Sequence, residues 1–249
     1  MKKFLVLLIL CGMFLLSGLM PACAETSADG APPAVEAVEE PYTGIFTVSS
    51  MLMIGLVAAV MAGGLMLSKR RVRWSPQMIA KAAVCMALAY VLSMIKIFRM
   101  PQGGSVTLIS LLPLILFAVA YGPLEGLLVG FAYGLLQLLI DPYVIHPVQL
   151  LVDYPIAFGA VALACSGAKL PLHARLKLPM AVLSGYFGRY VMAVLSGVVF
   201  FAEYAGDQGA LTYSLVYNIG YLGVEALMCA AVALAPGMHR LPAVLRDGR

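Results

Sequence analysis

Of the 249 residues of this chain, 62% are hydrophobic and 11% are charged, whereas roughly a quarter of the residues in an ordinary soluble domain are charged. Such a composition excludes a water-soluble protein and predicts one whose solvent is the lipid bilayer. The formal net charge is only +4 and the basic residues are scattered through short loops, so nucleic acid is excluded as a partner.

The N-terminal segment has the pattern of a secretory signal. Lys2 and Lys3 precede an apolar run from Phe4 to Leu19, and Ala22 and Ala24 form an A-x-A site before Glu25. The sequence predicts a signal peptide over 1–24, and leaves open an uncleaved helix or a lipoprotein signal. An acidic, proline-rich extracellular tether is expected over 25–42.

The rest of the chain alternates apolar runs of helix length with short polar breaks. A bilayer core of about 30 Å needs about 20 residues of helix. The runs predict an extra transmembrane helix and a basic cytoplasmic linker over 43–76, a membrane domain over 77–236 and a cytoplasmic tail over 237–249. The expected spans are Gly44–Leu67, Met78–Phe98, Ser105–Tyr121, Pro123–Ile140, Leu151–Ala168, Leu178–Phe201 and Thr212–Ala235.

The short loops differ in basic charge from one side of the predicted membrane to the other. Basic residues are retained on the cytoplasmic side, and they concentrate after the first span, in the loop 169–177 and in the C-terminal tail. The intervening loops are mainly acidic. This predicts a multi-pass protein of the plasma membrane with its mature N-terminus outside and its C-terminus in the cytoplasm.

Three ionisable residues, Arg189, Glu225 and Asp153, are expected at membrane depth, where each costs at least about 2.5 kcal/mol on insertion scales and is a functional hypothesis by default. Arg189 and Glu225 lie at matching depths in the last two spans, which predicts a structural ion pair between them. In the last span, Ser214, Asn218, Tyr221 and Glu225 share one helical stripe that should face the bundle interior.

Asp153 has no basic residue at its own depth. It lies near the outer end of its span beside Tyr154, in a segment rich in proline and aromatic residues. A carboxylate among aromatic rings suits an aromatic or quaternary cation, through charge attraction and cation–π contact. The alternative is an interfacial belt of tyrosines with no ligand.

Other sequence features argue against catalysis and metal binding. The chain contains no G-x-x-x-x-G-K-S/T phosphate loop and none of the hydrolase or metalloprotease motifs, so we expect no enzyme and no ATP binding of its own. Its five cysteines lack metal spacing, and no metal or cofactor is expected. Ala83 and Ala87, four residues apart, would let another helix or a partner subunit approach closely.

Four segments in the membrane domain resemble a known family: MPQGGSVTL from Met100, YGLLQLLIDPYVIHPVQLLVDYPIAFG from Tyr133, LSGVVFFAEYA from Leu195 and YSLVYN from Tyr213. They are similar to the thiamine-specific substrate-binding subunits (S components) of energy-coupling factor (ECF) transporters. The resemblance covers about 78–236. It implies an all-α, six-helix S-component bundle that binds thiamine, driven by a transmembrane coupling protein and two ATPase subunits.

The resemblance also implies a set of thiamine-binding residues. The acidic-aromatic pair of the family falls on Asp153 and Tyr154, its tyrosine and asparagine of the sixth helix on Tyr213 and Asn218, and an aromatic position on Phe201. Two positions depart from the family. Ala193 stands where many members have a binding histidine, and Gly103 where some have a tryptophan.

The predicted function is therefore high-affinity binding and uptake of thiamine by a membrane subunit that other subunits energise. Ala193 leaves open a thiamine precursor or another vitamin as the ligand. A membrane scaffold or sensor, which would use the extra N-terminal span to recruit partners, is the alternative from a different class.

Overall fold

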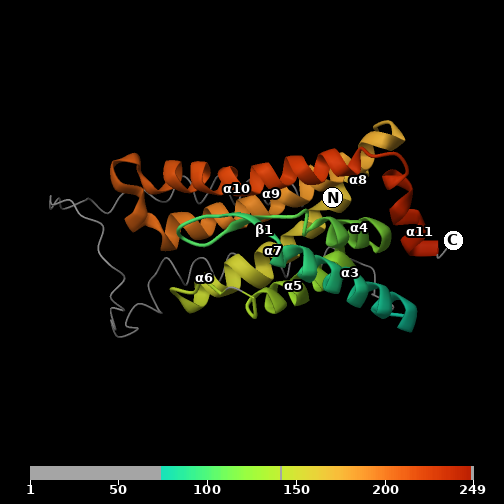
Figure 1. The fold of residues 1–249 in the computed structure, drawn as a ribbon, viewed down its shortest axis with the longest axis horizontal. Helices are drawn as coiled ribbons and strands as arrows, with labels where there is room; N and C mark the ends of the chain where they lie inside the picture. The colour runs from blue at the N-terminus through green and yellow to red at the C-terminus, as the bar shows by residue number, and fades with distance from the viewer. Residues whose placement is uncertain (1–73, 141, 248–249) are drawn as a thin grey trace. The chain divides into compact units, whose positions relative to one another are not determined.

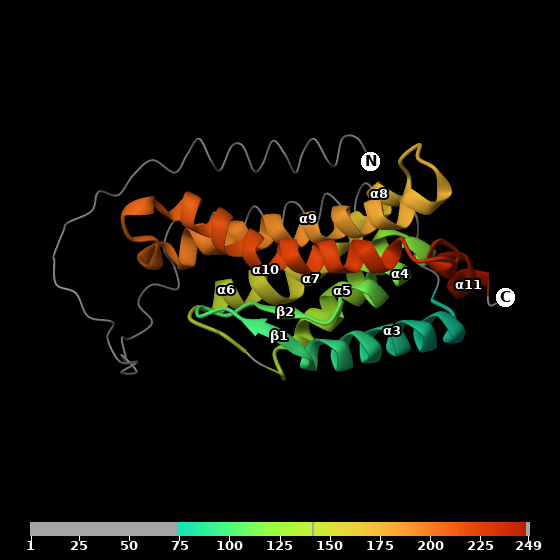
Figure 2. The same ribbon diagram turned by 45° about the horizontal axis from the view of Figure 1, so that its top comes forward.

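The computed structural model describes residues 74–140 and 142–247, so the predicted signal peptide, tether and extra span lie outside the described residues. This part of the chain forms one compact unit built mainly of helices (Figures 1 and 2). Its elements are α3 (Pro76–Met94), β1 (Lys96–Arg99), β2 (Ser105–Thr107), α4 (Leu112–Tyr121), α5 (Pro123–Gln137), α6 (Pro147–Leu151), η1 (Val152–Ile156), α7 (Ala157–Gly159), η2 (Ala160–Leu163), α8 (Ala164–Ala168), α9 (Ala174–Phe200), η3 (Ala202–Gln208), α10 (Ala210–Ala233), η4 (Met238–Arg240) and α11 (Leu241–Asp247).

Six helical segments correspond to the six spans predicted in this region. Four of them are long and apolar enough to cross a membrane, and they are Pro76–Met94, Pro147–Ala168, Ala174–Phe200 and Ala210–Ala233. The other two are shorter than predicted: α4 has 10 residues and α5 has 15. The predicted boundary between the spans ending at Tyr121 and beginning at Pro123 is confirmed, because α4 ends at Tyr121, α5 begins at Pro123, and Gly122 between them has φ 132°.

A two-stranded hairpin replaces the start of the predicted third span. Strands β1 and β2 are antiparallel, with Arg99 opposite Ser105 and a register irregularity between Lys96 and Phe98. The turn contains Gly103 and Gly104, both with φ near +80°, a conformation that residues with a Cβ adopt at a cost. The expectation that Ser105–Tyr121 is one continuous helix is therefore wrong.

The segment Pro147–Ala168 is helical throughout but departs from α-helical pitch in two places. It begins as α6, widens into the π-helical turn η1, returns to α7 and tightens into the 3₁₀ turn η2 before α8. Pro155 lies inside η1. Because proline has no N–H and its ring clashes with the preceding turn, it disrupts regular α-helical hydrogen bonding at this point.

The helices pack around an apolar core, with α9 and α10 side by side along their lengths (Figures 1 and 2). Buried core side chains include Phe117, Ile115, Leu222, Val182 and Tyr186. The residues expected to form a tail instead contain η4 and α11, and α11 packs against α4. There, the backbone oxygen of Leu245 accepts hydrogen bonds from Lys81 Nζ (2.5 Å) and from the Tyr121 hydroxyl (3.0 Å).

The helices run between two opposite ends of this unit, the cavity end and the tail end. The cavity end contains the β1–β2 hairpin, α6 and η3. The tail end contains the turn at Gly122, the α8–α9 turn and α11. Both views separate α6 from α11 in this way (Figures 1 and 2).

Candidate functional site

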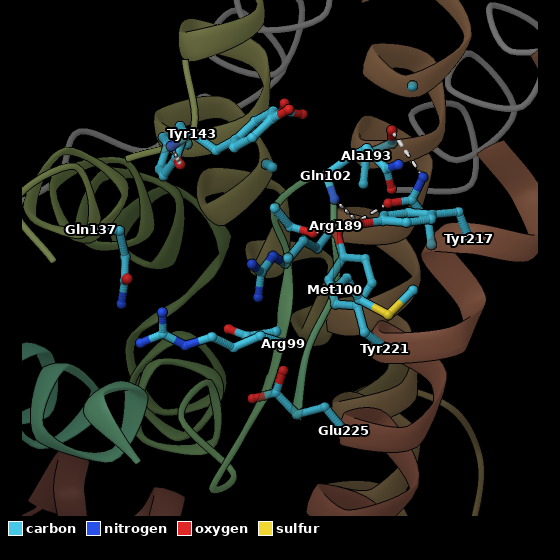
Figure 3. A pocket seen from close by; sticks show the side chains of 18 of the residues that line it. Arg99, Met100, Gln102, Gln137, Tyr143, Arg189, Ala193, Tyr217, Tyr221 and Glu225 are labelled. Carbon is cyan, nitrogen blue, oxygen red and sulfur yellow. Dashed lines mark hydrogen bonds between the residues drawn. The ribbon is translucent and has the colours of Figure 1, made fainter. Parts of the chain in front are cut away.

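A cavity of about 320 Å³ opens among the hairpin, α5, η1, α9 and α10. Its walls are polar and aromatic, and Figure 3 shows side chains from several elements pointing into it. All five residues predicted to bind the ligand line it: Asp153, Tyr154, Phe201, Tyr213 and Asn218. The structure thus brings together residues from three separate parts of the sequence.

Asp153 lies in the π-helical turn η1. The preceding helix α6 begins at Pro147, and the imidazole Nδ1 of His146 caps it by accepting a hydrogen bond from Val148 N at 3.1 Å. One turn before Asp153 is Gln149, whose amide Nε2 donates to Asp153 Oδ2 at 2.6 Å. The carboxylate is therefore anchored on one side while it lines the cavity.

An aromatic wall stands beside this carboxylate. The rings of Tyr143 and Phe201 stack with centroids 5.9 Å apart. The hydroxyl of Tyr154 accepts a hydrogen bond from Tyr143 N at 2.8 Å. Burial, followed by interaction with Tyr204, raises the pKa of the Tyr143 hydroxyl to about 12, so this ring is uncharged at neutral pH.

A ladder of tyrosines runs down α10 from the cavity mouth. The ring centroids of Tyr213 and Tyr217 are 5.6 Å apart, and those of Tyr217 and Tyr221 are 6.2 Å apart. Their spacing of four residues places them on one face of the helix. The Tyr217 hydroxyl also donates to Gly103 O at 2.7 Å and accepts from Gln102 N at 3.0 Å, which fixes the hairpin against α10.

Asn218 is buried and its amide is already engaged. The Nδ2 group donates to Ser214 O at 2.9 Å and to Ala193 O at 3.3 Å, while Oδ1 accepts from the Tyr221 hydroxyl at 3.0 Å. Asn218 therefore joins α9 to α10 and orients Tyr221. An amide oxygen has two lone pairs, so one acceptor position of Asn218 remains for a ligand.

Arg189 and Glu225 both line the cavity, but they do not form the predicted contact pair. Glu225, 1% exposed, accepts hydrogen bonds from the hydroxyls of Thr107 and Ser110. The Arg189 guanidinium instead lies over the Phe158 ring, 4.1 Å from its centroid. Both side chains reach into the same cavity (Figure 3).

The ion-pair prediction is corrected accordingly. Within 74–140 and 142–247, Arg189 and Glu225 form no ion pair within 4 Å, although their charges interact across the cavity. The physical reason is that the hydroxyls of Thr107, at the end of β2, and of Ser110, just after it, donate to the carboxylate directly, while an aromatic face holds the cation. The expectation that the stripe of Ser214, Asn218, Tyr221 and Glu225 faces the interior is confirmed, since all four are buried.

Several cavity residues were not identified from the sequence. Tyr143 and Gln149 come from the loop and short helix before Asp153, Thr107 ends strand β2 of the unpredicted hairpin, and Ser110 follows that strand. The signal that could have found Gln149 is its position four residues before Asp153 on one helical face. No helical spacing could have identified the hydroxyls of Thr107 and Ser110, because their positions depend on the hairpin.

The two positions that depart from the family both lie at the cavity. Ala193 lines it, and its backbone oxygen is held by Asn218. At Gly103, an added Cβ would lie 3.1 Å from the Tyr143 ring, so a larger residue would require that ring to move. Ala83 and Ala87 lie elsewhere, exposed on the surface of α3, and the described residues hold no cluster of potential metal ligands.

Comparisons with known proteins agree with this architecture. The family described as Thiamine transporter protein (Thia_YuaJ) matches residues 79–244. Thiamine transporter ThiT from Bacillus subtilis (strain 168) is 34% identical over 163 residues, which is 60% of this chain and 84% of that protein. A solved structure of ThiT from Listeria monocytogenes has a TM-score of 0.54 at 23% identity, covering 65% of this chain and 96% of that one. The chain therefore belongs to the thiamine transporter protein family, and its membrane domain has the ThiT-like S-component fold.

Proposed function

We propose that this chain is the thiamine-binding S component of an ECF-type transporter, and that separate ATPase and coupling subunits energise uptake. It acts as a binding subunit rather than as an enzyme. The observation that carries the proposal is the convergence of Asp153 and four other residues, chosen from sequence, on one cavity. Membership of the thiamine transporter family also supports the proposal.

The chemistry of thiamine matches the walls of this cavity. Thiamine joins a permanently cationic thiazolium ring to a neutral aminopyrimidine ring. Asp153 supplies the counter-charge, and the rings of Tyr154, Phe201 and Tyr213 supply aromatic faces for stacking and cation–π contact. Asn218 supplies a hydrogen-bond partner. The volume of about 320 Å³ lies within the range of about 300–1,000 Å³ that small-molecule sites occupy.

Isothermal titration calorimetry of the purified protein with thiamine tests the proposal. We expect binding at micromolar concentration or tighter. No binding at that concentration overturns the ligand assignment. Unchanged affinity in Asp153→Asn overturns the site while leaving the ligand.

The presence of Ala193 at the cavity favours a second candidate in the same class. Without the family's histidine, this position offers only a methyl group and leaves room beside Asn218. A thiamine precursor or another vitamin is then the ligand. A competition panel of thiamine, its separate pyrimidine and thiazole alcohols and other vitamins distinguishes the candidates by rank order.

The coupling partner is proposed to contact α3. Ala83 and Ala87 are exposed on this helix, and large apolar neighbours such as Val84 (66% exposed) and Leu88 (50%) lie beside them. Small residues let a partner helix approach closely within a membrane. Replacing both alanines by leucine should abolish co-purification of the coupling protein without changing thiamine affinity. Co-purification of no ATPase with the wild-type chain would instead support the scaffold alternative.

The proposal also includes the orientation of the chain in the membrane. We propose that the mature N-terminus lies outside and the C-terminus in the cytoplasm, which places the cavity end toward the exterior. The basic loop 169–177 at the tail end supports this. Cysteine-accessibility labelling of a residue in that loop and of one in 202–208 tests it, because only the second should react with a membrane-impermeant reagent.

A further inference from the structure

Gln149 lies between the loop that precedes α6 and the carboxylate of Asp153. Its side chain is only 2% exposed. A buried amide must satisfy its hydrogen-bonding groups within the protein, because leaving them unpaired costs more than a typical hydrogen bond contributes. The partners that Gln149 uses therefore show what it holds in place.

Three hydrogen bonds fix the orientation of this amide. The Nε2 group donates to Tyr143 O at 3.0 Å and to Asp153 Oδ2 at 2.6 Å, and Oε1 accepts from Ile145 N at 3.3 Å. Two acceptors face the nitrogen and one donor faces the oxygen, so the reversed amide would lose all three bonds. Gln149 thus has one conformation that the surroundings permit.

The bond to Asp153 has two effects on the cavity. It occupies one acceptor position of the carboxylate, at Oδ2, and leaves the others to further partners. It also satisfies part of the carboxylate with a neutral donor. A lysine or arginine in this place would hold Asp153 equally well but would cancel its negative charge. A glutamine donates a hydrogen bond to the carboxylate without adding a positive charge beside it.

The other two bonds connect this carboxylate to the aromatic wall. Tyr143 and Ile145 belong to the loop, and the Tyr143 ring stacks on Phe201. One side chain therefore sets both the carboxylate and the loop backbone that carries a cavity-lining ring.

We infer that Gln149 is a positioning residue that holds Asp153 and the Tyr143 loop in register, and so determines the preference of the cavity for a cationic ligand over a neutral one of the same shape. The inference rests on the proposed function, since it assumes that Asp153 faces the charged ring of thiamine. It concerns a residue that need not touch the ligand.

The experiment measures dissociation constants for two ligands, thiamine and an uncharged analogue in which a thiophene ring replaces the thiazolium. The variants are Gln149→Leu, Asp153→Asn and the double variant. The matched control is Gln137→Leu, because Gln137 is also a cavity glutamine but bonds to Ser93 and Tyr133 instead of a carboxylate. Unfolding temperature and elution profile establish that each variant folds.

We expect Gln149→Leu to weaken thiamine binding about tenfold to a hundredfold, the range for a lost hydrogen bond to a charged group. Binding of the neutral analogue should weaken no more than about threefold, which is the size expected for a modest packing change. In Gln137→Leu, the ratio of the two affinities should stay at its wild-type value. The double variant should show the ratio of Asp153→Asn alone, because both changes act through one carboxylate.

Two results overturn the inference without touching the proposed function. One is equal weakening of both ligands in Gln149→Leu, which would make the residue structural only. The other is unchanged affinity for both ligands in Gln149→Leu beside a reduced ratio in Asp153→Asn. If the leucine variant does not fold, Gln149→Asn, which keeps the amide but shortens its reach, is measured by the same two ligands. Failure of the wild type to bind thiamine would overturn the proposed function itself.

Discussion

The two ends of the described unit differ in the side chains that join their elements. At the tail end, backbones touch where side chains are absent: a Cβ on Gly167 would lie 2.2 Å from Met180 O, and one on Gly126 would lie 2.5 Å from the Ala118 Cβ. At the cavity end, glycines also pack closely, since a Cβ on Gly134 would lie 2.5 Å from Tyr154 O, but polar side chains join the elements as well, as when the Tyr217 hydroxyl holds the hairpin. A methyl group added at a tail-end glycine should therefore lower stability, while loss of a polar side chain at the cavity end should lower affinity before it lowers stability.

The largest expected effect tests the tail end. Gly167→Ala should lower the free energy of unfolding by about 3 kcal/mol, the upper part of the range for overpacking, because both Met180 O and Ser184 Oγ occupy the space that the methyl group needs. Thermal unfolding in detergent measures it. The control is Gly220→Ala on α10, whose Cβ would approach only Met100 Cε at 3.9 Å. Equal unfolding temperatures for the two variants would remove the contrast between the ends.

The next effect tests the cavity end. Asp153→Asn keeps the shape of the side chain and removes its charge, so thiamine affinity should fall about thirtyfold, roughly 2 kcal/mol. The unfolding temperature should change little, because the asparagine can still accept a hydrogen bond from Gln149. Calorimetry and thermal unfolding give the two values. A large loss of stability with unchanged affinity would reverse the assignment of this end.

A smaller effect should follow from loosening the hairpin. Tyr217→Phe removes the hydroxyl that bonds Gly103 O and Gln102 N. The expected loss is about 1 kcal/mol, or about fivefold in thiamine affinity. Tyr213→Phe is the matched control, since no hydrogen bond of its hydroxyl is found among the described residues and its ring would remain. If both variants bind equally, the hairpin contact does not contribute to the site.

The smallest effect is expected at the exposed surface of the tail end. Arg246 Nε lies 2.9 Å from Asp247 Oδ1, and this hydrogen bond lowers the pKa of Asp247. Any stability that the pair supplies is present at neutral pH and is lost as acid protonates the carboxylate. Both groups are solvated, so Asp247→Asn should leave the unfolding temperature unchanged at neutral pH. A measurable decrease would show that α11 depends on this pair.

Much of the fold followed from apolar run length and from turn chemistry. Gly122 and Pro123 marked the α4–α5 turn because each has a specific backbone preference. The β1–β2 hairpin was not predicted, since its strands continue an apolar run in which helix and strand cannot be separated by periodicity. The π-helical turn was also missed, because a proline in a helical run predicts a disruption but not its form.

The site was predictable where it depended on one helix at a time. The stripe containing Asn218 and Glu225 follows from helical spacing alone, and the structure confirms that it is buried. The partner of Glu225 was not predictable, because matching depth identifies charges that share a cavity but not those that touch. Thr107 and Ser110, which bond to Glu225, lie at the end of the unpredicted strand β2 and just after it.

The π-helical turn Val152–Ile156 has a consequence for how this site can change in evolution. A π-helical turn is equivalent to one residue inserted into an α-helix, and each residue of an α-helix turns the chain by about 100°. Deleting a single residue after Tyr154 would let the turn relax toward regular helix and rotate Asp153 and Tyr154 relative to everything that follows. Ligand binding could thus be lost, or regained, through a change in chain length that leaves every cavity side chain in the sequence.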